Sequence, residues 1–92
     1  MSVYIEDSVR VSDPQRFIDA CKRWEAEMAD AGARNLHFYR SESDPNLMLV
    51  AAEYENHDTY HALTEKYGDR FQTDAGTDGL QWETRIWKST LG

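Results

Sequence analysis

The chain has 92 residues, enough for one small domain, and it carries a formal net charge of −7 at pH 7. This charge repels nucleic acid phosphates and anionic lipids, and no cluster of Lys and Arg offsets it, so we expect no nucleic acid and no membrane partner. Three Trp, five Tyr and three Phe supply apolar surface for a folded core. We therefore expect residues 1–92 to form one folded domain.

The cysteine content and the hydropathy indicate in which cellular compartment the protein is located. Cys21 is the single cysteine, so no internal disulfide can form, which is typical of a reducing environment. No stretch approaches the ~20 apolar residues that a membrane span requires, and no basic segment followed by an apolar run opens the chain. We expect a cytoplasmic protein.

The beginning of the chain predicts a strand and then a helix. Residues 3–12 alternate between apolar and polar side chains, as a β-strand does. Asp7 falls on the apolar side of this alternation. It marks either a β-bulge or a break between two short strands, or it is a polar group aimed into a cavity, and we favour a bulge or break. Asp13 as N-cap and Pro14 as first helical residue then predict a helix that ends near Ala31.

The middle of the chain predicts a β-hairpin. Residues 35–40 alternate so that His37 and Tyr39 share one face, opposite to their apolar neighbours. Residues 41–46 form a polar turn. Residues 47–54 are the most continuous apolar run and place apolar side chains on both faces of a strand, so both faces must be covered.

A second helix starts at Asn56 or Asp58. Gly68 destabilises a helix by roughly 1 kcal/mol relative to Ala, so we expect the helix to bend or end near it. Residues 72–79 are expected to form an acidic, solvated loop, and residues 80–88 the last strand. One stripe of this helix faces the sheet and comprises Tyr60, Leu63, Thr64, Tyr67 and Phe71.

The predicted order β-α-β-β-α-β is the ferredoxin-like α+β arrangement. Right-handed crossovers place both helices on one face of a four-stranded antiparallel sheet. The helices cannot cover the other face, where the strand at residues 47–54 is also apolar. We therefore expect a homodimer packed sheet to sheet, a dimeric α+β barrel.

Six short segments resemble the antibiotic biosynthesis monooxygenase family of small ferredoxin-like dimers. They are Asp13-Pro14, Gly32-Ala33, Phe38-Tyr39-Arg40, Asp44-Pro45-Asn46, the run from Ala52 to Asn56, and Arg85-Ile86-Trp87. The resemblance implies a mostly apolar cleft between sheet and helices, and a cofactor-independent monooxygenase that acts on an aromatic or polyketide-like molecule. Two alternatives stay open, a polyketide cyclase of the same fold and a non-catalytic dimeric module that binds a ligand or stabilises another protein.

Two histidines are candidates for a general base, because a neutral imidazole can take a phenolic or carbon-bound proton near pH 7. His57 lies beside the stripe of the second helix and is the first choice, and His37 is the second. Proton removal would leave an electron-rich anion that reacts with oxygen directly or closes a ring by attacking a carbonyl. The candidate substrate-binding residues are Tyr60, Tyr67, Tyr39, Trp82 and Asp7.

His57 and His61 stand four residues apart at the start of a helix, a spacing that lets two rings face one metal ion. No third ligand stands at a recognisable spacing, so we expect no metal site and no cofactor. A cleft with His37 or His57 beside a tyrosine would favour an enzyme. A cleft filled by Trp and Tyr side chains would favour the binding module.

Overall fold

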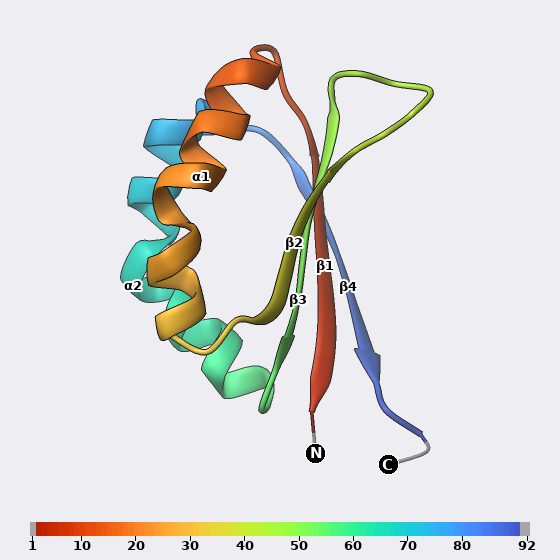
Figure 1. The fold of residues 1–92 in the computed structure, drawn as a ribbon, viewed down its shortest axis with the longest axis vertical. Coiled ribbons are helices and arrows are strands. Elements are labelled where there is room, and N and C mark those ends of the chain that lie inside the picture. The colour runs from red at the N-terminus through yellow and green to blue at the C-terminus, as the bar shows by residue number, and fades with distance from the viewer. Residues whose placement is uncertain (1, 91–92) are drawn as a thin grey trace.

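The computed structural model describes residues 2–90 as a sheet with two helices packed on one of its faces (Figure 1). The four antiparallel strands stand in the order β2-β3-β1-β4, which confirms the expected ferredoxin-like arrangement. No helix in residues 2–90 is long and apolar enough to cross a membrane. The elements are β1 (Val3–Arg10), α1 (Pro14–Asp30), β2 (Arg34–Arg40), β3 (Leu47–Tyr54), α2 (His57–Ala75) and β4 (Trp82–Lys88).

Helix α1 begins and ends where its sequence predicts. The Asp13 carboxylate accepts a hydrogen bond from the backbone N–H of Arg16 at 3.1 Å, and Pro14 opens the first turn. Gly32 follows the helix with φ +115°, a conformation that L side chains rarely adopt. The buried stripe of α1 comprises Phe17, Ala20, Cys21, Trp24 and Met28.

Helix α2 is longer than its sequence suggests. Its N-cap is Asn56, whose side chain accepts from the backbone N–H of Thr59 at 2.9 Å. The expected end near Gly68 is wrong, because the helix continues to Ala75, and the buried residues Phe71 and Ala75 lie three and seven positions farther on and hold it against the core. Packing of this apolar stripe outweighs the weak helix propensity of one glycine.

The C-terminal end of α2 replaces part of the predicted acidic loop. Residues 72–75 are helical, and Gly76 ends the helix in the left-handed region at φ 73°. The Arg16 guanidinium donates to the backbone carbonyls of Asp74 at 3.0 Å and Thr73 at 2.6 Å. These bonds satisfy carbonyls that the helix end leaves without an intrahelical partner. Thr77 is fully buried, so only the rest of the segment is a solvated connector.

Strand β1 runs through Asp7 without a bulge. The register is continuous on both sides, with Asp7 opposite Val50 of β3 and Thr84 of β4. The bulge favoured from the sequence is therefore wrong, and Asp7 points to the helix side of the sheet. Its side chain is held there by hydrogen bonds, which remove the need for a local break in the strand.

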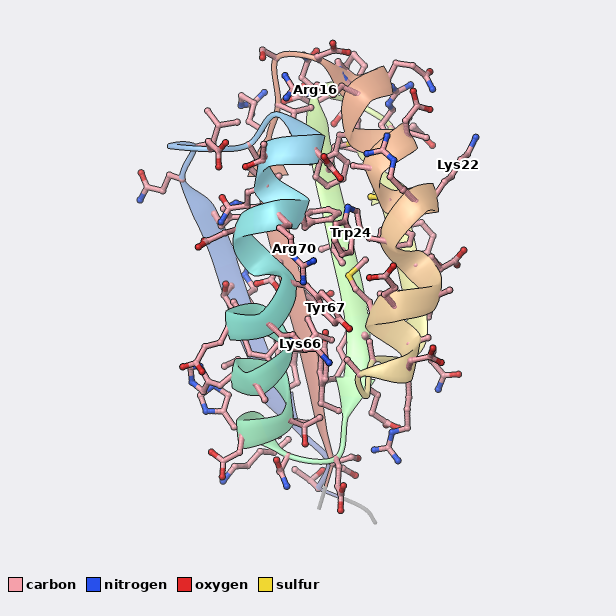
Figure 2. All side chains as sticks on the ribbon, turned by 90° about the vertical axis from the view of Figure 1, so that its left-hand side faces the viewer. Arg16, Lys22, Trp24, Lys66, Tyr67 and Arg70 are labelled. Atoms are coloured by element: carbon pink, nitrogen blue, oxygen red, sulfur yellow. The ribbon has the colours of Figure 1, made fainter. Side chains whose placement is uncertain are left out.

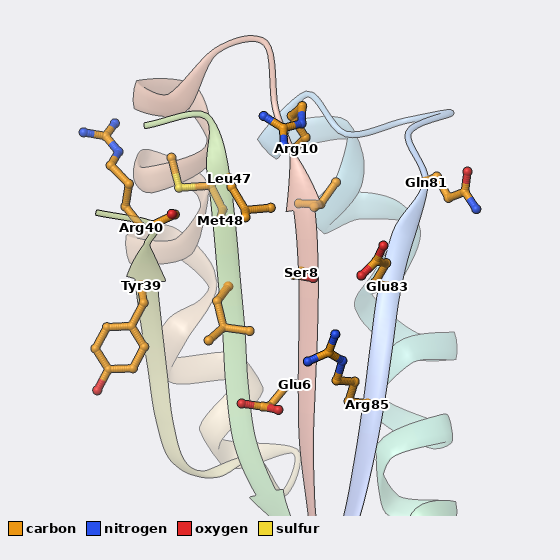
Figure 3. Close-up of a pocket in the computed structure, with 13 residues that line it drawn as sticks. Glu6, Ser8, Arg10, Tyr39, Arg40, Leu47, Met48, Gln81, Glu83 and Arg85 are labelled. Carbon is orange, nitrogen blue, oxygen red and sulfur yellow. The ribbon is translucent and has the colours of Figure 1, made fainter. Parts of the chain in front are cut away.

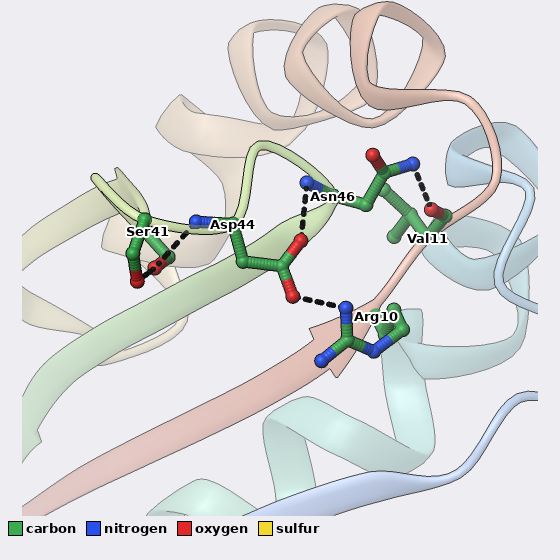
Figure 4. A network of polar contacts seen from close by, with 6 residues as sticks. Arg10, Val11, Ser41, Asp44 and Asn46 are labelled. Carbon is green, nitrogen blue, oxygen red and sulfur yellow. Dashed lines mark hydrogen bonds and ion pairs between the residues drawn. The ribbon is translucent and has the colours of Figure 1, made fainter.

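The turn between β2 and β3 is the polar turn that its sequence predicts (Figure 4). The Asp44 carboxylate accepts from the backbone N–H of Asn46 and pairs with Arg10 on β1. The Asn46 amide donates to the carbonyl of Val11 at 2.7 Å. The bond from Asn46 and the nearby Arg10 guanidinium lower the pKa of the Asp44 carboxyl. The turn is thus attached to β1, which lies next to β3.

The two faces of the sheet differ in what covers them. The inner face meets the helices and is buried, and the outer face is open in this chain (Figure 1). The central strand β3 has apolar residues on both sides, as expected, with Met48 and Val50 inward and Leu47 and Leu49 outward. The buried inward residues of the two central strands are Val3, Ile5, Val9, Met48, Ala52 and Tyr54.

Candidate functional site

A cleft of about 180 Å³ lies between helix α2 and the inner face of the sheet. One wall comes from α2, and the floor comes from β1, β3 and β4. Most of the lining is apolar or aromatic, as is usual for small-molecule sites. The lining residues are Asp7, Met28, Val50, Tyr54, Tyr60, Leu63, Thr64, Tyr67, Gly68, Phe71, Gln72, Trp82 and Thr84.

Asp7 is the acidic group of this cleft. Its carboxylate accepts hydrogen bonds from the Tyr60 hydroxyl at 2.9 Å and from the Thr84 hydroxyl at 2.5 Å. Among residues 2–90, no Lys, Arg or His forms an ion pair with it. Burial raises the pKa of the Asp7 carboxyl, and the two hydroxyl donors oppose that rise only in part.

Two tyrosines stand beside this carboxylate. Burial, together with the adjacent charge of Asp7, raises the pKa of Tyr60 to about 12 and also raises that of Tyr54. Their rings meet edge to face, with centroids 5.3 Å apart. Both phenols therefore stay protonated near neutral pH, and Tyr60 acts as a hydrogen-bond donor.

Tyr67 and Trp82 line the cleft as well, farther from Asp7. The Tyr67 ring packs against Trp24 of α1 at 5.6 Å, and the Arg70 guanidinium lies 5.4 Å from both rings (Figure 2). The stacked side chains of Trp24, Tyr67 and Arg70 thus fill the interface between α1 and α2 on the side of the cleft away from the sheet. The Trp82 indole packs on Phe17 and donates a hydrogen bond of 3.3 Å to the side chain of Gln72.

The first candidate base, His57, lies outside the lining of the cleft. It is exposed at the start of α2, where its ring stacks on Tyr60 with 11° between the planes and contacts His61 at a centroid distance of 4.3 Å. Within residues 2–90, no group of three or more His, Cys, Asp or Glu is arranged to hold a metal ion. The structure therefore brings His57 next to a cleft residue, but not into the cleft.

His37 and Tyr39 lie on the opposite face of the sheet. Strand β2 pairs His37 with Ala51 and Tyr39 with Leu49, both of which point outward. The two rings contact each other at 5.7 Å, and Tyr39 is 58% exposed. The structure thus separates these two residues from Asp7, Tyr60, Tyr67 and Trp82, which it brings together.

A broader hollow of about 540 Å³ covers the outer face (Figure 3). Its walls carry charges of both signs, including Glu6, Glu83, Arg10, Arg40 and Arg85. Although it is larger than the inner cleft, it is a curved sheet surface open to solvent, and a second chain packed on this face would cover it. We therefore take the smaller inner cleft as the candidate ligand site.

Thr84 and Gln72 line the cleft but are absent from the candidates that the sequence predicts. Thr84 alternates with Trp82 and Ile86 on the inner side of β4, so the period-two pattern already placed it there. Its hydroxyl could have pointed to a polar site, because Thr84 lies directly opposite Asp7 in the sheet. Gln72 gave no such signal, because its segment was taken as loop.

Solved structures with this arrangement are available for comparison. The chain matches a protein from Bordetella bronchiseptica, provisionally named an antibiotic biosynthesis monooxygenase, with 12% identity, a TM-score of 0.82 and 98% of each chain covered. It matches SnoaB, a cofactor-independent oxygenase from Streptomyces nogalater, with 16% identity, a TM-score of 0.76, and 99% of this chain and 94% of SnoaB covered. The chain shares their fold.

At these identities the likeness establishes the fold and not the activity. The de novo designed protein Foldit4 illustrates this limit, since it matches with 15% identity, a TM-score of 0.73, and 97% of this chain and 99% of its own covered. No family model and no curated protein sequence matches the chain. The residues of the cleft are therefore the basis for a proposed function.

Proposed function

We propose that the chain is a small cofactor-independent monooxygenase that acts on an aromatic or polyketide-like molecule bound in the inner cleft. The support is the oxygenase fold together with a mostly apolar cleft of about 180 Å³ that contains one acidic group. In this proposal the cleft holds a hydroxylated ring, and Asp7 accepts a proton from it.

The observation that carries the proposal is the half-buried Asp7 carboxylate in the cleft. A carboxylate removed from water without a cation beside it destabilises a fold, so a purely structural cleft would favour an apolar residue at this position. Here burial raises its pKa, and a carboxyl in a cleft with a pKa raised in this way is typical of a functional group. A higher pKa also makes the carboxylate a stronger base toward a phenolic substrate.

The chemistry needs only the substrate, oxygen and a base. Proton transfer to Asp7 leaves an electron-rich phenolate, which gives electrons to O₂ and forms a carbon–oxygen bond. Loss of water from the hydroperoxide then yields a quinone, so one oxygen atom enters the product and the other leaves as water. Phenol plus O₂ balances as benzoquinone plus water, and the substrate supplies all the electrons. Tyr60 and Thr84 orient the Asp7 carboxylate throughout.

Oxygen uptake with a panel of phenols, hydroquinones and anthrones tests this proposal. With a panel member that is turned over, Asp7→Asn should lower turnover by ~10²–10⁴-fold, the usual contribution of a positioned general base. Glu6→Gln is the matched control, because Glu6 is the neighbouring acid on the outer face and should leave turnover unchanged. Mass spectrometry should find one atom of ¹⁸O₂ in the product. No uptake with any panel member, or full activity in Asp7→Asn, would contradict the proposal.

The same assay decides between Asp7 and the histidines. His57 stacks on Tyr60 outside the cleft, so His57→Ala should lower turnover less than about threefold, while a positioned base contributes ~10² or more. His61→Ala and His37→Ala should have the same small effect on turnover as His57→Ala. A loss of ~10²–10⁴-fold confined to His57→Ala would return the role of base to that residue.

A non-catalytic ligand-binding module is the second candidate. It is favoured by the composition of the cleft, whose lining within residues 2–90 includes Tyr54, Tyr60, Tyr67 and Trp82 but no histidine. Tight binding of a ring compound without oxygen uptake, by a protein whose Asp7→Asn variant loses that binding, would favour the module.

We also propose that two chains pack through their outer sheet faces. The support is the set of apolar side chains that this face presents. Tyr39, which is 58% exposed, lies beside Leu49, and Trp87, which is 55% exposed, lies on β4 toward the other end of the sheet. Large exposed aromatic side chains of this kind mark association surfaces. A second copy would cover both them and the hollow of Figure 3.

A further inference from the structure

The size of the inner cleft limits the size of its ligand. Its volume is about 180 Å³, below the ~300 Å³ at which drug-sized sites begin. An apolar cavity of ~150 Å³ holds a single benzene molecule. The walls cannot recede easily, because Phe71 packs edge to face on Phe17 at 5.9 Å and Tyr67 is packed against Trp24.

The polar groups of the cleft limit the chemistry of its ligand. An ionised Asp7 only accepts hydrogen bonds, so a ligand group beside it must donate. Two donors, Tyr60 and Thr84, already occupy part of its capacity, and a carboxylate can accept about four. A ligand hydroxyl supplies the further donor, whereas a ligand carboxylate would place two negative charges side by side.

No positively charged side chain in the described part of the chain lies in the cleft to compensate such a pair. Within residues 2–90, no Lys, Arg or His lines the cleft. The nearby guanidinium of Arg70 lies over the rings of Trp24 and Tyr67, on the outer side of the interface between α1 and α2. Like charges in a low-dielectric site repel strongly, so anions should be excluded.

We propose that the cleft selects neutral, single-ring phenols and hydroquinones and rejects both fused-ring compounds and aromatic carboxylates. This selection rests on the proposed function only in taking the inner cleft as the binding site. It narrows the substrate class to molecules of one ring. The aromatic side chains contact the ring, and Asp7 accepts from its hydroxyl.

Binding by calorimetry tests the charge selection separately from turnover. The probes are 4-hydroxybenzamide and 4-hydroxybenzoate, which match in size and differ in charge. We expect the wild type to bind the benzamide at least about tenfold more tightly, and Asp7→Asn to bind the two within about threefold, since about 1.4 kcal/mol corresponds to a factor of ten. Exclusion of the benzoate that persists in Asp7→Asn would overturn the assignment to Asp7.

The size selection is tested in the wild type with 4-methylphenol and 2-naphthol. The naphthol should bind about tenfold or more weakly, and Leu63→Ala, which enlarges the buried wall, should reduce this difference. Equal or tighter binding of the naphthol by the wild type would overturn the inference. Selective binding of the single-ring probes without any oxygen uptake would leave the inference standing and overturn the monooxygenase proposal instead.

Discussion

Asp7 and Glu6 are adjacent on β1, and the two faces of the sheet give them different surroundings. Glu6 points to the outer face, where its carboxylate accepts a hydrogen bond from the Trp87 indole at 2.8 Å. Asp7 points to the inner face, beneath α2, where burial raises its pKa and two hydroxyls donate to it. A shift of one residue along the strand therefore decides whether a carboxylate is a surface group or a candidate base.

The same contrast extends to the hydrophobic residues of β3. Met48 and Val50 point to the inner face, where the helices of the same chain cover them. Leu47 and Leu49 lie on the outer side, beside the exposed Tyr39. The inner face is thus complete within one chain and encloses a small cleft, whereas the outer face is large and open and suits a second chain.

The largest effect is expected at the outer face. Leu49→Asp should weaken dimerisation by roughly 30-fold or more, because it puts a charge in place of the apolar side chain beside Tyr39, and an interface contact of this kind contributes ~2 kcal/mol. Sedimentation at micromolar concentration should then shift from two chain masses to one. Ala26→Asp, on the exposed side of α1, is the control and should stay dimeric. A wild type that is monomeric at these concentrations would refute the dimer.

A smaller effect is expected from two matched hydroxyl deletions. Tyr60→Phe removes a donor to the half-buried Asp7 carboxylate and should lower the free energy of unfolding by ~1–2 kcal/mol. Tyr39→Phe removes an exposed hydroxyl on the outer face and should change it little. Urea unfolding of both variants measures the contrast. Equal losses in the two variants would show that the inner face does not depend on this bond.

The pH dependence of stability should separate the two carboxylates. Because the folded-state pKa of Asp7 is raised, the folded protein holds this proton to higher pH than the unfolded chain does. Its contribution therefore favours folding below the ordinary Asp pKa of ~3.9 and is lost as the pH rises through the raised value.

The stability of Asp7→Asn relative to wild type should therefore increase from about pH 4 upward. Effects of other acids, such as the lowered pKa of Asp74, cancel in this comparison because both proteins share them. Glu6→Gln should not reproduce the trend. A difference between Asp7→Asn and wild type that stays constant with pH would contradict a raised pKa at Asp7.

Much of the fold was predictable because local signals agree with the packing. Asp13-Pro14 and Gly32 bound α1, and the alternation in each strand assigns its two faces. The helix end at Gly68 was predicted wrongly because propensity was judged without Phe71 and Ala75, whose burial extends α2. Local sequence patterns indicate which secondary structure an isolated segment favours, whereas tertiary packing decides where the helix ends.

The candidate site was only partly readable from the sequence. Periodicity placed Tyr60 and Tyr67 on the sheet side of α2, and Trp82 was named as a further candidate; all three line the cleft. Asp7 was named as a candidate substrate-binding residue, but a bulge was favoured for it because its partners Tyr60 and Thr84 are 53 and 77 residues away. Hydrogen bonds over such separations leave no local pattern. The histidines were candidates because an imidazole is a good base near pH 7. The strand register puts His37 on the outer face, and His57 and His61 lie at the start of α2, outside the cleft lining.

The central claim is that a small aromatic ligand binds on the inner face and not on the outer one. Nuclear magnetic resonance with ¹³C-labelled side chains and 4-hydroxybenzamide tests it directly. We predict chemical-shift changes at Leu63, Phe71 and Trp82, which line the inner cleft, and reduced binding in Asp7→Asn. Changes confined to Leu49 and Tyr39, which line the outer hollow, would contradict the claim.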